Sequence, residues 1–155
     1  MRSTLNFNSH WQFTKPGAAP VAVTLPHTWN AADGTDGGND YFRGICTYTR
    51  EFAAPAHADD EEVWLEFEGA AMTAVVTLNE QELTRHAGGY STFRVNLTPA
   101  LAAQNTLTVT VDNSANRTVY PQKADFAFYG GLYRDVHILT VPHSHFALGH
   151  HGAPA

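Results

Sequence analysis

The sequence is poor in cysteine and in charge: it has one cysteine, Cys46, and only 15% of its 155 residues are charged. A single cysteine excludes a disulfide within the chain. No apolar run approaches the roughly 20 residues of a membrane-spanning helix, and the first residues lack the apolar stretch of a signal peptide. The nine Lys and Arg residues are scattered and the net charge is -6, which is unfavourable for nucleic-acid binding. We expect no membrane partner, no nucleic-acid partner and a cytoplasmic location, with export left open.

Helical periodicity is missing over any window of 12 or more residues, whereas alternation with a period of two is frequent. The apolar residues Val63, Leu65 and Phe67 alternate with more polar neighbours, as in a strand with one buried face. Thr98 followed by Pro99 indicates a helix N-cap and the first position of one short helical turn. Strands are expected at residues 5–15, 21–25, 45–52, 63–67, 73–78, 82–84, 92–97, 106–112 and 135–141.

Short strands separated by turn residues predict an all-β fold, an antiparallel β-sandwich. The jelly-roll form of the sandwich is expected, because two long loops interrupt the strands. The first loop spans residues 27–44 and is rich in glycine and acidic residues. We expect a single domain over residues 1–155, with residues 142–155 as a flexible or incomplete tail.

The second loop contains the most unusual stretch of the chain, Asp125 to Val136. It combines an acid, four aromatic residues and the pair Gly130–Gly131. Adjacent glycines indicate a sharp turn or a close approach of another surface to the backbone. An acid among aromatic rings suits a sugar site, because rings stack on a pyranose and a carboxylate accepts hydrogen bonds from its hydroxyls. Ordinary packing of the rings, with Asp125 capping a turn, is the alternative.

Catalytic chemistry is not evident. A retaining glycosidase needs two carboxylates about 5–5.5 Å apart, and the acids here lie mostly in loops or at outward strand positions. The sequence has no Gly-x-Ser-x-Gly motif, phosphate loop or Cys-x-x-Cys pair. Four histidines gather near the tail without the spacing of a zinc site. We therefore predict no catalytic residue and no metal ligand; the four histidines are His143, His145, His150 and His151.

Three stretches, in this order, carry a family resemblance. They are residues 25–44, which begin Leu-Pro-His-Thr-Trp-Asn, residues 78–93 with His-Ala-Gly-Gly-Tyr-Ser-Thr-Phe, and residues 125–136. Together they resemble the N-terminal sugar-binding domain of glycoside hydrolase family 2, which includes β-galactosidases, β-glucuronidases and β-mannosidases. The first stretch most resembles the β-galactosidase members.

The resemblance implies a jelly-roll domain at the front of a larger glycosidase whose catalytic glutamates lie on a later barrel. The chain alone would be inactive, and its partners would be the downstream domains of the same polypeptide and a β-galactoside-type sugar. Asp125 matches the family acid that contacts the sugar and, in some members, a monovalent cation. Asn39 or Asp40 falls where another loop residue reaches the sugar, and Arg134–Asp135 is interpreted as structural. No other cofactor is expected. A stand-alone carbohydrate-binding module and a purely structural domain that braces the barrel remain alternatives.

Overall fold

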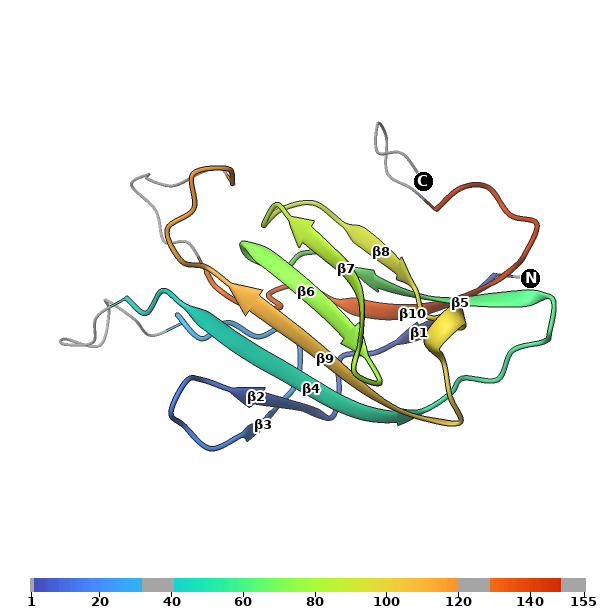
Figure 1. The fold of residues 1–155 in the computed structure, drawn as a ribbon, viewed down its shortest axis with the longest axis horizontal. Coiled ribbons are helices and arrows are strands. Elements are labelled where there is room, and N and C mark those ends of the chain that lie inside the picture. Colours follow the sequence, from blue (N-terminus) through green and yellow to red (C-terminus); the bar gives the residue numbers. More distant parts are fainter. Residues whose placement is uncertain (1, 32–40, 120–128, 149–155) are drawn as a thin grey trace.

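The computed structural model describes residues 2–31, 41–119 and 129–148. They form two antiparallel sheets that enclose one core (Figure 1). The four-stranded sheet has the order β1 (Ser3–Asn6), β10 (Val136–Pro142), β5 (Glu61–Phe67) and β8 (Phe93–Asn96). The six-stranded sheet has the order β3 (Val21–Val23), β2 (Trp11–Thr14), β4 (Ile45–Ala53), β9 (Gln104–Asp112), β6 (Thr73–Leu78) and β7 (Gln81–Ala87). The predicted antiparallel β-sandwich is confirmed.

The core lies between the sheets and follows the alternation seen in the sequence. Val63, Leu65 and Phe67 of β5 are fully buried, and they share one cluster with alternate residues of β9. Burial of each such side chain stabilises the fold by about 1.5–3 kcal/mol. Because the opposite faces of these strands point away from the core, their polar residues are placed on the outer surface.

The expected strand over residues 5–15 is instead two strands, β1 and β2, which belong to different sheets. The chain crosses between the sheets at Phe7 and Asn8, both buried. The Asn8 side chain donates to Asp135 Oδ1 (2.9 Å) and accepts a hydrogen bond from Val136 N (2.9 Å). The Asn8 backbone carbonyl accepts a hydrogen bond from Leu25 N (2.9 Å). These bonds hold the crossing in place.

The predicted helix cap at Thr98 is also corrected. A 3-10 helix spans Thr98–Ala100, with Leu97 at the cap position and Pro99 in its first turn. The Thr98 hydroxyl does not cap the helix. It accepts a hydrogen bond from Val63 N (2.8 Å) and so ties the helix to β5.

Hydrogen bonds hold the segment after β10 to the rest of the chain, although most of its described side chains are exposed. His143 N donates to Asp60 O (2.8 Å), and Arg94 Nη1 donates to Leu148 O (2.7 Å). The proposed tail begins at residue 142, and its last residues, 149–155, lie outside the described part. No helix among the described residues is long and apolar enough to cross a membrane.

Candidate functional site

The chain segments that flank residues 32–40 and 120–128 meet at one end of the sandwich, at the left of Figure 1. There β4 begins and β9 ends, with Ile45 and Asp112 paired across the strands. We call the residues that join these segments the loop-base cluster: Trp29, Asn30, Phe42, Asn113 and Gly130.

Asn30 is the centre of the loop-base cluster and is almost fully buried, with 1% exposure. Its Oδ1 accepts hydrogen bonds from Gly130 N (2.8 Å) and Asn113 Nδ2 (3.3 Å), and its Nδ2 donates to Phe42 O (2.9 Å). An asparagine amide offers both donors and acceptors, so one side chain satisfies three distant segments at once. Asn30 therefore fixes the bases of both long loops relative to each other.

Asn113 completes the cluster where β9 ends. Its side chain is fully buried, and its Oδ1 accepts a hydrogen bond from Gly44 N (2.8 Å). Its backbone N donates to Gly44 O (3.2 Å), and its carbonyl accepts from Arg43 Nε (2.7 Å). These contacts hold the end of the first loop, at Arg43 and Gly44, against Asn113, where the chain leaves β9 toward the second loop.

Gly130 and Gly131 are required by the space around them. A Cβ on Gly130 would lie 2.3 Å from Trp29 Cζ2, and one on Gly131, whose φ is +129°, would lie 2.6 Å from the Tyr48 hydroxyl. The Gly130 carbonyl also accepts a hydrogen bond from Thr28 Oγ1 (2.8 Å). The close approach that the glycine pair indicated is confirmed.

A pair of titratable groups, the half-buried His27 and the buried Tyr48, lies next to Gly131. His27 Nδ1 and the Tyr48 hydroxyl are 2.8 Å apart, and Phe13 packs against both rings. Burial lowers the pKa of His27 from 6.5 and raises the pKa of Tyr48 above its usual value. Both groups are therefore neutral at pH 7. They pack against the turn at Gly131.

The surface at this end carries three large, half-exposed apolar or aromatic side chains. Ile45 is 51% exposed, Tyr90 50% and Tyr129 47%. Tyr133 joins the loop of Tyr90 to the glycine turn, because its hydroxyl donates to Gly89 O (2.5 Å) and its ring packs edge-on to Tyr90. The arrangement offers aromatic faces and apolar surface to a ligand or a neighbouring domain.

The residues predicted to contact sugar, Asp125, Asn39 and Asp40, lie outside the described residues, so their predicted role stays a prediction. The structural interpretation of Arg134–Asp135 agrees with the contacts. Asp135 Oδ1 accepts a hydrogen bond from Asn8, and its carbonyl accepts one from Glu68 N (3.1 Å).

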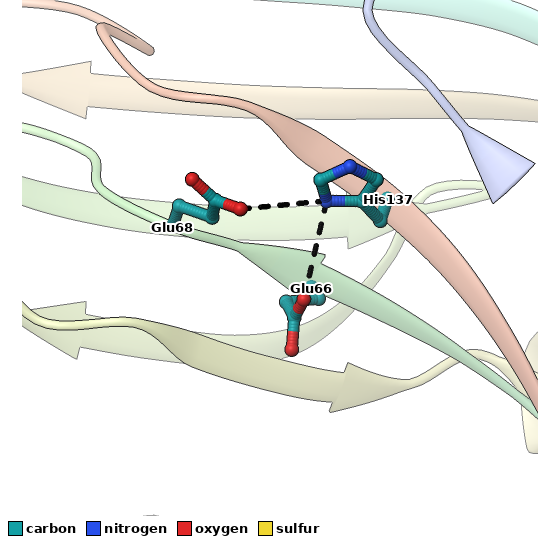
Figure 2. A group of neighbouring side chains, drawn as sticks. All are labelled: Glu66, Glu68 and His137. Carbon is teal, nitrogen blue, oxygen red and sulfur yellow. Dashed lines mark ion pairs between the residues drawn. The ribbon is translucent and has the colours of Figure 1, made fainter. Parts of the chain in front are cut away.

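Sequence reasoning missed two groups. Asn30 lies in a stretch that carried the family resemblance, but no local signal marks it as the link between both loops. Glu66, Glu68 and His137 come together on the outer face of the four-stranded sheet (Figure 2). The sequence pattern predicts outward, solvated positions for these acids, and only the pairing of β5 with β10 reveals their histidine neighbour.

Comparison with known proteins gives consistent matches. The family model described as glycosyl hydrolase 2 galactose-binding domain-like matches residues 41–154. The crystal structure of an FMN-binding β-glucuronidase from Facaelibacterium prausnitzii L2-6 is similar with a TM-score of 0.92 and 41% identity, over 99% of this chain and 25% of that chain. A Bacteroides uniformis β-glucuronidase structure is similar with a TM-score of 0.87 and 35% identity, over 99% of this chain and 19% of that chain.

Two curated relatives carry different names. A β-glucuronidase from Bacteroides fragilis is 34% identical over 90% of this chain and 21% of its own length. A β-galactosidase from Thermoanaerobacter pseudethanolicus is 24% identical over 93% of this chain and 22% of its own length. The chain thus spans about a fifth of the length of these relatives.

Proposed function

The chain belongs to the galactose-binding-like domains of glycosyl hydrolase family 2, and from this premise we propose that it is a non-catalytic domain that completes the sugar pocket of a catalytic domain outside the chain. The family that the three sequence stretches indicated is confirmed. Relatives named β-glucuronidase and β-galactosidase both match, so the proposed substrate class is a β-glucuronide or β-galactoside.

The loop-base cluster is the observation that supports this proposal. Phe42 follows residues 32–40 of the first loop, and Gly130 follows residues 120–128 of the second. The backbones of Phe42 and Gly130 both form hydrogen bonds with the Asn30 side chain. At the other end of the second loop, buried Val119 packs with Ala71 and Met72. Both loops thus start and finish at one end of the sandwich, which is where a pocket wall built from two loops has to be anchored.

The proposed sugar contacts are Asp125 and either Asn39 or Asp40, which belong to these two loops. Fixed oxygen acceptors would orient the sugar hydroxyls, and orientation lowers a reaction barrier without any proton transfer by these residues. A monovalent cation at Asp125 is part of the proposal. The half-exposed Ile45, Tyr90 and Tyr129 support the docking of a catalytic domain beside the loops.

The first test uses the chain by itself with nitrophenyl β-glucuronide and nitrophenyl β-galactoside. No hydrolysis and negligible calorimetric binding of the free sugars are expected, because most of the pocket lies elsewhere. Sub-millimolar binding of either sugar would favour a stand-alone carbohydrate-binding module. Hydrolysis that scales with chain concentration and disappears in Asp125→Asn would contradict the proposal.

The second test uses a polypeptide that joins this domain to its catalytic domain. Asp125→Ala should lower kcat/KM roughly 10- to 100-fold, because a hydrogen bond to a charged group contributes about 1.5–3 kcal/mol. Activation by sodium or potassium should disappear in the same variant. Asp59→Ala is the matched control, since Asp59 is an exposed loop acid away from the cluster. Unchanged kinetics in Asp125→Ala would leave only a bracing role.

A further inference from the structure

We propose that Glu66, Glu68 and His137 form a binding site for one divalent transition-metal cation, such as Zn²⁺, on the outer face of the four-stranded sheet. Figure 2 shows the two carboxylates directed toward the same ring nitrogen of His137. The site is separate from the loop-base cluster, which joins the first and second loops where β4 begins and β9 ends.

The sheet register brings the three ligands together. His137 of β10 is the direct antiparallel partner of Glu66 of β5. Glu68 lies two residues beyond Glu66 and so projects from the same face. The register is firmly set, because a slip of one residue would turn the buried Val63, Leu65 and Phe67 out of the core. The cluster is therefore preformed by the core packing.

The distances suit a shared cation better than direct hydrogen bonds. His137 Nδ1 lies 3.9 Å from Glu66 Oε1 and 3.8 Å from Glu68 Oε1, beyond the 2.7–3.2 Å of a hydrogen bond. Two ligands bound at 2.0–2.2 Å with tetrahedral angles lie about 3.3–3.6 Å apart. All three ligand atoms lie within 4.8 Å of one another, so side-chain adjustments of up to about 1.5 Å, for which the half-exposed Glu68 has room, would place them around one ion.

His137 Nδ1 gives an independent sign of a ligand, because the atom is buried and has no hydrogen-bond partner. A buried polar atom without a partner is unfavourable and usually has an explanation in a bound ion or water. As a metal ligand, this nitrogen would direct its lone pair at the space between the carboxylates. A cation in that space would satisfy the nitrogen and both acids together.

The surrounding charges leave room for the ion. Arg94 pairs with Glu66 through Oε2, so Glu66 Oε1 remains on the side of His137. Arg94 thereby orients the carboxylate, as the outer partners of metal ligands do. Glu68 is less buried, with 42% of its side chain exposed, which gives the ion a path to solvent and water for its remaining positions. One imidazole with two carboxylates favours Zn²⁺ over the all-oxygen preference of Mg²⁺ or Ca²⁺.

The experiment titrates zinc chloride into the full chain, freed of metal by a chelator, in competition with a chromophoric zinc indicator. Glu68→Gln and His137→Gln should each weaken binding at least tenfold, whereas the exposed controls Glu51→Gln and His57→Gln should not change it. Zinc should raise the melting temperature of the unmodified chain but not that of Glu68→Gln. The same titration is made in a chain with glutamine at four histidines that follow β10: His143, His145, His150 and His151.

The proposal is overturned if the unmodified chain does not bind zinc. It is equally overturned if binding persists in both site variants or disappears when the four C-terminal histidines are replaced. Circular dichroism establishes that each variant is folded. If His137→Gln does not fold, Glu68→Gln decides the question, because this half-exposed side chain can be changed without opening the core.

Discussion

Replacing Asn30 by alanine should lower the free energy of unfolding by about 2–4 kcal/mol. The change removes the hydrogen bonds to Gly130 N, Asn113 Nδ2 and Phe42 O, each with a net contribution of about 0.5–1.5 kcal/mol. It also leaves the buried Gly130 N–H without its acceptor, which costs about 1–3 kcal/mol by itself. For a domain of this size the melting temperature should fall by roughly 5–15 °C.

Urea unfolding followed by tryptophan fluorescence measures this loss, and Trp29 lies within the affected cluster. Gln104→Ala is the matched control: this exposed amide at the start of β9 should change stability by less than about 0.5 kcal/mol. Asn113→Ala and the double variant Asn30→Ala/Asn113→Ala complete a double-mutant cycle. Because the two side chains are in direct contact, we expect an interaction energy of about 0.5 kcal/mol or more between them. A loss below about 0.5 kcal/mol for Asn30→Ala would refute the role assigned to the loop-base cluster.

Three further predictions concern the same end of the sandwich and the core. Gly130→Ala should destabilise the chain by at least about 1–3 kcal/mol in the same assay, because its methyl group would overlap Trp29; an unchanged urea midpoint would contradict this. Burial lowers the pKa of His27 from 6.5 in the folded chain. As the pH falls, the unfolded chain therefore binds a proton at His27 at a higher pH than the folded chain does. Stability should be fully present above about pH 6.5 and decline as the pH falls below it, with a shallower decline in His27→Gln; equal slopes would exclude His27. Burial raises the pKa of the Cys46 thiol to about 11, so at pH 8 a disulfide reagent should modify it only after unfolding, and rapid modification of the folded chain would show that Cys46 is accessible.

Local patterns predicted much of the fold because they act over a few residues. Alternation in Val63–Phe67 identified β5, and the glycine pair at 130–131 indicated a close approach that the structure contains. The same local reading could not separate β1 from β2, since the assignment of each strand to a sheet depends on the crossing at Asn8. The cap at Thr98 failed for a similar reason: a strand neighbour competes for its hydroxyl.

The fold class and the family follow from the sequence alone, because periodicity and three ordered stretches are properties of neighbouring residues. The link that Asn30 makes between both loop bases, and the position of His137 opposite Glu66, depend on the folded chain. These contacts join residues far apart in the chain, and strand order and register place them. Register is fixed collectively by the packing of the whole core, so no single segment encodes it.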